Sequence, residues 1–347
     1  MLKPELDYLE LTEFLSNWAG SYIENLSQFP NGQVASVFAF DVPGHSELEG
    51  QNGEYVARFV SYENAEGLKK DRFIAPRAAE VGIPVPRQLE HGETRMKVAN
   101  LSDDEKPNYD QASFPLAYAI CVRAPGEHME ELQAPERRHL VPTTVAAIDT
   151  ISTIDVSDTI RFGWFDGEGD GKHATWTDYI AANAFPHGGD NFYERRRKWF
   201  DEGFLEADVF QHFSDRMMEL ADFTPRDERS VVHMEFGYDN TLVVGNEVSA
   251  ALDWDNSIIG DHVYDGAWND LYMPEIDFKR LFTERYELTG RDVPNLDERW
   301  MYCQIHICIQ ALRWDGRSNN PSAYEWMKAR TLHVLGEGPP VGWHPDS

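Results

Sequence analysis

The sequence predicts an α+β protein with two lobes, a small lobe built on an antiparallel sheet and a larger, mainly helical lobe. Two observations predict this class. Helical stripes alternate with short hydrophobic runs in the first part of the chain, whereas the pattern from residue 135 onward is mostly helical. The breaker Ala124-Pro125-Gly126 stands directly after a predicted strand, where the pattern changes. We therefore predict an N-lobe at residues 1–122 and a C-lobe at residues 123–347.

The N-lobe pattern predicts helix, strands, helix and strands in that order. Residues 3–27 carry apolar side chains mostly three, four or seven positions apart, which is the stripe of an amphipathic helix, and Pro30-Asn31-Gly32 ends it. A second helix is predicted at residues 63–79. Strands are predicted at residues 34–42, 54–60, 85–89 and 114–122, with polar loops at residues 46–53 and 100–112.

The C-lobe pattern is helical except for one segment. Helices are predicted at residues 141–151, 176–184, 191–200 and 206–220, and again between residues 264 and 335. The segment at residues 230–265 interrupts them with a short hairpin. A cleft between two such lobes is where small molecules usually bind.

The charge of the chain narrows the class of partner. Acidic residues outnumber basic ones by 60 to 31, which gives a formal net charge of −29 at pH 7. Such a surface repels nucleic acid and attracts a cationic small molecule. Two interpretations of the excess remain open: a soluble acidic surface, or adaptation to high salt, where dense carboxylates stay hydrated and their repulsion is screened.

Compartment signals are few. Cys121, Cys303 and Cys308 show no C-x-x-C spacing and make no disulfide framework. The chain contains no apolar run long enough to span a membrane, and its N-terminus lacks a basic-then-apolar signal pattern. We therefore expect a cytoplasmic protein with no membrane partner.

The segment at residues 230–265 carries the residues that are candidates for binding and catalysis. A hydrophobic run at Val231-Val232 leads into a polar turn with Glu235 and Asn240, and a second run at residues 248–252 ends at Asp253. An amide and a carboxylate at the two ends of a hairpin suit Mg²⁺, which takes a few protein oxygens and leaves its other positions to phosphate and water. The same arrangement suits phosphoryl transfer, in which a carboxylate orients the attacking hydroxyl.

This segment resembles the catalytic and metal-binding loops of the aminoglycoside phosphotransferase family, which has a protein-kinase-like fold, and within it the hygromycin B phosphotransferase branch. His233, Asn240 and Asp253-Trp254-Asp255 fit the family pattern, as do Gly260-Asp261 and Tyr264-Asp265 beyond. Met234 replaces a small residue, and Glu235 stands where the family has its catalytic aspartate. Three further stretches match in order: residues 32–42, residues 55–72, and residues 162–180.

The resemblance implies a role for each candidate residue. Asn240 and Asp253 would hold Mg²⁺, Asp255 would add to metal or substrate binding, and Glu235 would be the base or orienting group for the acceptor hydroxyl. ATP would lie under Gly32 and Ser36, Arg58 would clamp its phosphates, and the hinge at Cys121 and Arg123 would present backbone groups to adenine. For Arg58 we expect an ion pair with Asp71, with Glu66 and Glu80 as rivals. His233 would fix the loop, Asp261 and Asp265 would cap and tie the following helix, and Asp178, Asp270 and Glu275 are candidate acids for the acceptor pocket.

The expected function is ATP-dependent, Mg-assisted phosphorylation of a hydroxyl on a small, cationic molecule such as an aminoglycoside. No G-x-S-x-G elbow or reactive cysteine points to a covalent intermediate, so direct in-line transfer is expected. Two alternatives remain open. One is a metabolite kinase of the choline, homoserine or fructosamine kinase type, and the other is a catalytically silent nucleotide-binding protein, suggested by Glu235.

Overall fold

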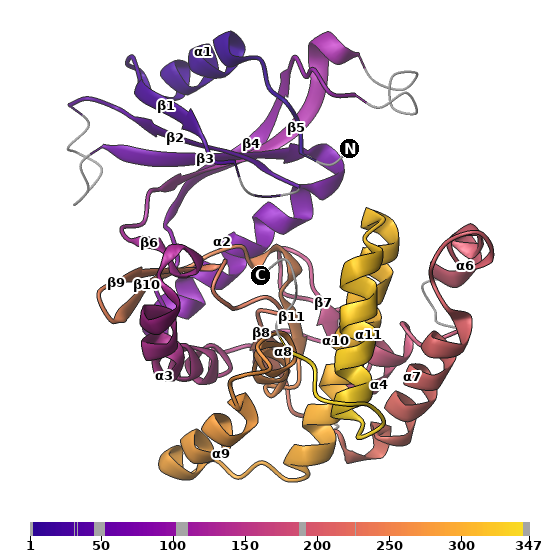
Figure 1. Cartoon of the computed structure of the whole chain (residues 1–347). Coiled ribbons are helices and arrows are strands. Elements are labelled where there is room, and N and C mark those ends of the chain that lie inside the picture. Colours follow the sequence, from indigo (N-terminus) through magenta and orange to yellow (C-terminus); the bar gives the residue numbers. More distant parts are fainter. Residues whose placement is uncertain are drawn as a thin grey trace.

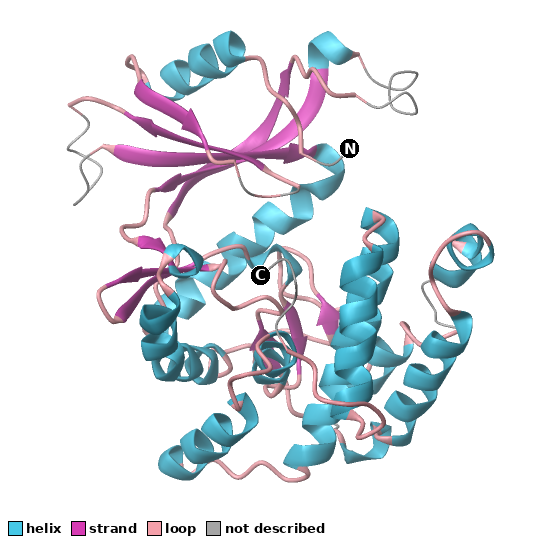
Figure 2. Cartoon of the chain, viewed as in Figure 1, coloured by secondary structure: helices cyan, strands magenta, loops and turns pink. Residues whose placement is uncertain are grey.

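The computed structural model describes residues 3–30, 32, 34–44, 53–101, 110–186, 192–225 and 227–342. The predicted loops at residues 46–53 and 100–112 lie largely outside the described residues. A sheet-bearing region at one end and a mainly helical region at the other make up the described chain, which confirms the α+β class (Figures 1 and 2).

The sheet region holds one antiparallel sheet with the strand order β1-β2-β3-β5-β4. Its strands are β1 (Glu24–Gln28), β2 (Ser36–Asp41), β3 (Glu54–Ser61), β4 (Gln88–Met96) and β5 (Phe114–Val122). Strands β2, β3 and β5 match the predicted ranges. β4 begins at the end of the run predicted at residues 85–89 and continues beyond it.

The first helix is shorter than predicted. Helix α1 (Tyr8–Ala19) begins at Asp7, whose side chain accepts from the backbone N–H groups of Leu9 and Glu10, and ends at Gly20 with φ 63°. A left-handed residue of this kind stops a helix. The apolar stripe at residues 3–27 therefore covers a helix and then strand β1, which the sequence reading missed.

The two helices of this region cover opposite faces of the sheet. Side chains of α1 pack with Phe38, Phe40, Ala57 and Phe59 on one face. Leu68 of α2 (Ala65–Glu80) packs with the other face, and α2 continues toward the helical region (Figure 1). Because side chains alternate along a strand, Arg58, between Ala57 and Phe59, belongs to the α2 face.

The helical region contains two small antiparallel sheets as well as helices. One has the order β10-β9-β6 and the other β7-β11-β8. Their strands are β6 (Glu127–His128), β7 (Gly163–Trp164), β8 (Ser230–Val232), β9 (Thr241–Val244), β10 (Glu247–Ala251) and β11 (Ile258–Gly260). The helices are α3 (Ala134–Ile151), α4 (Trp176–Ala181), α5 (Phe192–Arg195), α6 (Arg197–Asp201), α7 (Ala207–Glu219), α8 (Tyr264–Tyr272), α9 (Phe278–Thr289), α10 (Leu296–Ser318) and α11 (Pro321–Val334).

The largest hydrophobic core lies in the helical region, where it surrounds α10 and the small sheets. This core also takes in Phe73, Ile74 and Ala78 of α2. Helix α2 is therefore shared between the two regions, and it packs directly on the short 3₁₀ helix η5 (Trp254–Asn256). In the described part of the chain, no helix is long and apolar enough to cross a membrane.

Candidate active site

The hairpin of β9 and β10 brings Asn240 and Asp253 to the same end of one small sheet. Thr241 pairs with Ala251, and the backbone N–H of Leu252 donates to the carbonyl of Asn240 at 2.9 Å. Asn240 precedes the first strand and Asp253 follows Leu252, so the pairing places the two side chains at neighbouring positions. The predicted bracketing of a hairpin by these two residues is confirmed.

The loop before the hairpin is held by buried polar contacts. The backbone N–H groups of His233 and Met234 donate to the carboxylate of Asp265 at 2.8 and 2.7 Å, and Met234 has φ 75°. His233 Nε2 lies 2.8 Å from the carbonyl of Leu252, and its ring packs on Trp254 at 4.4 Å. Burial lowers the pKa of His233 to about 4, so the ring is neutral near pH 7. His233 thus fixes the loop, and Asp265 ties the loop to α8.

Glu235 lies within this loop with its carboxylate turned toward η5. The side-chain amide of Asn256 donates to its Oε2 at 3.1 Å, and the amide of Asn240 donates to its backbone carbonyl at 3.0 Å. Burial, together with the nearby charges of Asp253, Asp239 and Asp255, outweighs the bond from Asn256 and raises the pKa of Glu235 to about 7. A carboxyl in that range can both hold and release a proton near neutral pH.

Arg58 meets three carboxylates from two parts of the fold. Its guanidinium lies 2.5 Å from Asp71 of α2, 3.3 Å from Asp253 and 3.2 Å from Asp255. The predicted ion pair with Asp71 is confirmed; the rival Glu66 pairs with Lys69 instead. Burial acts to lower the pKa of Arg58, but the three carboxylates outweigh it and raise the pKa.

The carboxylates around Arg58 outnumber its single charge. Burial raises the pKa of Asp71, and Asp255 and Asp253 add to the rise against the opposing charge of Arg58. The pKa of Asp255 is raised in the same way, first by burial and then by Asp253. Excess negative charge of this kind favours the arrival of a further cation.

The donor set fits a hard divalent cation. The nitrogen of the Asn240 amide is used within the loop, so its oxygen is the atom that could ligate, and the Asp253 side chain is half exposed. In the described residues, no group of three or more His, Cys, Asp or Glu is arranged to hold a metal ion. In nucleotide sites, Mg²⁺ commonly binds one or two protein oxygens, and phosphate and water complete its coordination shell.

Ser36 requires a correction. Its side chain is fully buried and its hydroxyl donates to the carbonyl of Pro4, so it is not available to a phosphate in this structure. The spacing in the sequence could not show this, because Pro4 lies 32 positions away. Gly32 has φ 97°, a backbone conformation that favours glycine.

The predicted hinge residues lie at the end of β5. Cys121 is buried and pairs with Val56 on one side and Gln88 on the other. The backbone N–H of Arg123 donates to the carbonyl of Glu54 at 3.1 Å, and its side chain lies 3.7 Å from the Glu54 carboxylate. These contacts fix the end of the strand.

Two of the candidate acceptor acids have structural partners instead. Asp178 completes the capping box at the start of α4 with Thr175. Asp270 accepts from Trp300, Gln304 and the backbone of Phe278, which ties α8, α9 and α10 together. Both carboxylates therefore have partners within the fold, and their place at the acceptor pocket stays a prediction.

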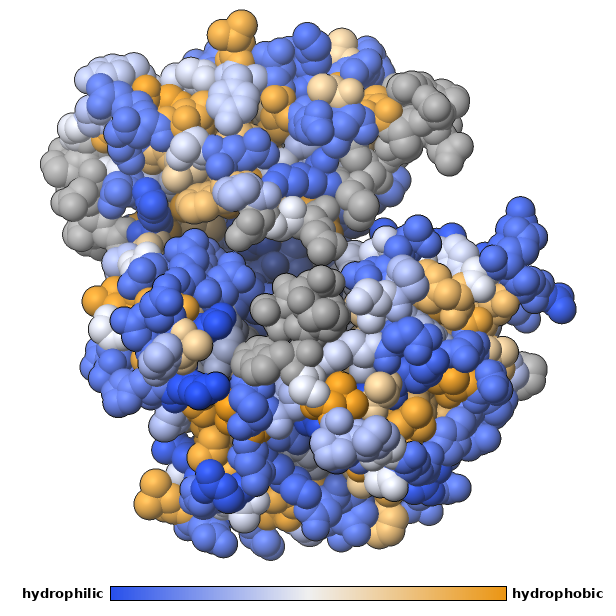
Figure 3. Space-filling model, in the orientation of Figure 1, coloured by the Kyte–Doolittle hydropathy of each residue, from blue (hydrophilic) through white to orange (hydrophobic). Residues whose placement is uncertain are grey.

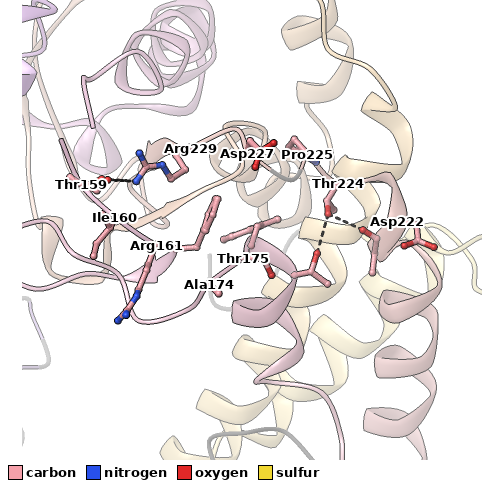
Figure 4. A pocket seen from close by; sticks show the side chains of 14 residues that line it. Thr159, Ile160, Arg161, Ala174, Thr175, Asp222, Thr224, Pro225, Asp227 and Arg229 are labelled. Atoms are coloured by element: carbon pink, nitrogen blue, oxygen red, sulfur yellow. Dashed lines mark hydrogen bonds between the residues drawn. The ribbon is translucent and has the colours of Figure 1, made fainter. Parts of the chain in front are cut away.

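A separate pocket of about 650 Å³ lies in the helical region (Figure 4). It is lined by residues 159–162, 174–177, 221–222, 224–225, 227 and 229. Arg229 of this pocket precedes β8, whereas His233 follows β8, so the pocket and the loop that carries Glu235 lie toward opposite ends of that strand. None of the predicted site residues lines it. Figure 3 shows instead a hollow between the sheet and helical regions, on a face that is mostly hydrophilic.

Three residues with clear positions at the site were missed from the sequence. Lys70 of α2 is fully buried and donates to the backbone carbonyls of Asp255, within η5, and Ser257, directly after it. Asn256 holds Glu235, and Asp239 stands beside Asn240 with a pKa that burial raises. A signal existed for Lys70 alone: it lies three and four positions from Gly67 and Ile74, on the face of α2 that is otherwise buried.

Comparison with known proteins gives consistent results. The family described as "Phosphotransferase enzyme family" matches residues 26–285. Hygromycin-B 4-O-kinase of Escherichia coli is 31% identical over 295 residues, which cover 84% of this chain and 76% of that protein.

Solved structures of aminoglycoside phosphotransferases are also similar to this chain. A thermostable mutant of aminoglycoside phosphotransferase APH(4)-Ia, in a ternary complex with AMP-PNP and hygromycin B, is 25% identical with a TM-score of 0.73 and covers 96% of this chain and 99% of its own. Another structure of APH(4)-Ia has a TM-score of 0.74 at 24% identity, with 96% and 100% of the two chains covered. Variants of the mutant enzyme change an aspartate and the asparagines at the fourth and fifth positions after it, the spacing that separates Glu235 from Asp239 and Asn240 here.

Proposed function

The chain belongs to the phosphotransferase enzyme family, and from that premise we propose that it transfers the γ-phosphoryl group of ATP to a hydroxyl of an aminoglycoside of the hygromycin type. One observation carries the proposal: Glu235, Asn240 and Asp253 gather at one end of the β9–β10 hairpin, against Arg58 of β3. The relatives named with ATP analogues, ADP and hygromycin B support the nucleotide and the acceptor class.

We assign the role of general base to Glu235. The acceptor oxygen forms a bond to the γ-phosphorus as the bond to the bridging oxygen of ADP breaks, and the hydroxyl proton passes to the Glu235 carboxylate. The contact from Asn256 to Oε2 leaves Oε1 as the oxygen that receives this proton. A pKa raised to about 7 suits this task, because the group is then partly ionised at neutral pH.

Asn240 and Asp253 are the residues we assign to Mg²⁺. A bound Mg²⁺ would neutralise charge that develops on the phosphate oxygens. The excess of carboxylates around Arg58 supports this assignment, since a cation would relieve it. Arg58 itself would hold nucleotide phosphates through its forked guanidinium.

The remaining nucleotide contacts are assigned to the sheet region. Gly32 would let the chain approach the phosphates closely, and the backbone at Cys121 and Arg123 would meet adenine. We place the division between the lobes after Val122, where β5 ends. The ATP and the acceptor would then lie in the hollow between the lobes, within reach of Glu235.

A transfer assay tests the proposal. Phosphate transfer from ATP in the presence of Mg²⁺ is measured against hygromycin B, other aminoglycosides and small amino-alcohols, at low and at high salt. Turnover with hygromycin B or another aminoglycoside supports the proposal. Turnover with an amino-alcohol alone would replace it with a metabolite kinase, and nucleotide binding without transfer to any acceptor would favour the silent alternative.

A further inference from the structure

Lys70 of α2 has its amino group buried against main chain, and this burial lowers its pKa to about 7. Its side chain is fully buried, and Nζ donates to the carbonyls of Asp255 and Ser257, each at 2.8 Å. The ammonium also lies 3.7 Å from the ring centre of Trp164 and 4.7 Å from that of Phe165. Burying a charge is costly unless it is well satisfied, so a lysine in this position requires a specific reason.

The two carbonyls lie on the segment that carries the proposed metal ligand Asp253. They belong to residues two and four positions after it, one within η5 and one directly after it. Asp253 itself has φ 60° and ψ 65°, a left-handed conformation that costs free energy in a residue other than glycine. A fixed main chain on its C-terminal side would hold Asp253 in that conformation.

Helix α2 approaches this segment closely on the same face. A Cβ atom at Gly67 would lie 2.6 Å from Cγ of Asp255, so only glycine allows this packing. Gly67, Lys70 and Asp71 lie three and four positions apart, which places them on one side of the helix. One face of α2 therefore meets the metal-binding segment through packing, main-chain hydrogen bonds and the Arg58–Asp71 pair.

Lys70 and Arg58 bind this segment through different atoms. Arg58 contacts the carboxylates of Asp253 and Asp255, which an arriving metal would share or take over. Lys70 contacts carbonyl oxygens, which do not compete with the metal. Its bonds can therefore persist whether or not a metal is bound.

We propose that Lys70 is a positioning residue that holds the segment of residues 253–257 by its main chain, so that Asp253 is preset for Mg²⁺. The inference rests on the proposed function, because it assumes that Asp253 is a ligand. Outer residues that orient a ligand typically contribute about 10- to 100-fold to metal affinity. Loss of the Lys70 donors should have an effect of that size.

The test compares Lys70→Met with a matched control, Lys69→Met. Methionine keeps the apolar stem of Lys70 and removes its donors, while Lys69 is a half-exposed neighbour that forms an ion pair with Glu66. Mg²⁺ is titrated by calorimetry into full-length protein saturated with AMP-PNP, and AMP-PNP binding is also measured without metal. We expect the apparent Kd for Mg²⁺ to rise about 10-fold or more in Lys70→Met, with AMP-PNP binding without metal changed less than about 2-fold. Lys69→Met should match the unmodified protein.

A second variant guards against a folding defect. Lys70→Gln keeps amide N–H donors on a shorter chain, and it should fold and show a smaller rise in the Kd for Mg²⁺ than Lys70→Met. The inference is overturned if both Lys70 variants bind Mg²⁺ as the unmodified protein does, or if AMP-PNP binding without metal weakens as much as Mg²⁺ binding. If the unmodified protein binds no Mg²⁺ with AMP-PNP, the proposed function fails rather than the role of Lys70.

Discussion

Two clusters of arginine and acid differ in their balance of charge. The cleft cluster consists of Arg58 with Asp71, Asp253 and Asp255. The internal cluster lies between α3, α9, α10 and the chain around β8 and β11, and consists of Arg285, Arg291 and Arg299 with Asp149, Glu228 and Asp261. The cleft cluster has one guanidinium group for three carboxylates. The internal cluster has three guanidinium groups for three carboxylates.

The pKa values of acids in the two clusters are shifted in opposite directions. In the cleft cluster the pKa values of Asp71 and Asp255 are raised, so ionisation costs free energy there. In the internal cluster, burial opposes ionisation of Glu228, but the hydrogen bond from His262 and the charges of His262, Arg299 and Arg291 outweigh it and lower the pKa to about 2. Removing one partner from a balanced buried cluster leaves an uncompensated charge, whereas an unbalanced cluster favours an external cation.

The largest expected effect is the loss of transfer in Asp253→Ala. Removing a ligand of the proposed metal should lower the rate of phosphate transfer by about 1000-fold or more, which would leave no detectable turnover. The unfolding free energy without Mg²⁺ should not fall, because the variant removes one of the excess carboxylates beside Asp255. Rate assays and thermal unfolding without metal check both parts. Undiminished turnover would remove Asp253 from the site.

Asp261→Asn should give the opposite result. Asp261 accepts from Arg299 at 2.6 and 2.9 Å, and both side chains are buried. Neutralising it leaves the guanidinium without its main partner, which typically costs about 3–5 kcal/mol of unfolding free energy. Denaturant unfolding measures the loss, and AMP-PNP binding below the transition should be unchanged. The matched variant Asp253→Asn should lose activity and keep its stability; if both variants behave alike, the contrast between the clusters does not hold.

The variant Glu235→Asp tests the proposed role of Glu235 as the base beside the cleft cluster. The shorter acid should lose the contact from Asn256 and lie about 1 Å from its productive position, at a cost of about 10- to 100-fold in kcat. Asn256→Ala should lower kcat alone but add little to Glu235→Asp, since both remove the same contact. Rate measurements on the two single variants and the double variant test this coupling. A gain of activity in Glu235→Asp would show instead that glutamate impairs the site.

The smallest expected effect is a two-sided dependence of stability on pH. Glu235 has a folded-state pKa raised to about 7 from 4.5, so its contribution is present below about 4.5 and is lost as pH rises toward 7. Glu228 has a folded-state pKa lowered to about 2, so its contribution is present above 4.5 and is lost as pH falls toward 2. Without Mg²⁺, the unfolding free energy should rise by about 1 kcal/mol from pH 7 to 5 and then fall in acid.

Glu228→Gln provides the control for the pH profile. It should remove most of the fall below pH 4.5 and leave the rise between pH 7 and 5 in place. Chemical unfolding across pH measures both limbs. A monotonic profile in the unmodified protein would mean that the pKa values of Glu235 and Glu228 are not shifted in opposite directions.

Much of the fold was predictable because it depends on local spacing. The ranges of β2, β3, β5, α2 and α7, and the hairpin between Asn240 and Asp253, follow from apolar periodicity and turn residues. At residues 3–27 one apolar stripe spans both a helix and a strand, and the local pattern does not separate the two. The left-handed conformation of Gly20 ends the helix and thus separates them.

The side-chain partners were less predictable because they come from distant parts of the chain. Asp71 was identified as the partner of Arg58, 13 positions away, whereas the contact from Arg58 to Asp253 spans 195 positions. The partners of Ser36 and Asp270 could not be predicted, since a hydroxyl or carboxylate has the same local sequence pattern at a ligand site and within the fold. Their contacts with Pro4 and Trp300 decide between the two.

The sequence by itself determined the class of fold, many of the helices and strands, and the segment that carries the candidate site, because periodicity and short motifs are properties of neighbouring residues. Only the tertiary structure decided which charges are balanced. The free energy of a buried charge depends on every group within a few ångströms, and in this protein those groups come from α2, β3 and the residues after β10. The same contacts buried Lys70 against the carbonyls of Asp255 and Ser257 and left the cleft cluster with more negative charge than Arg58 can offset.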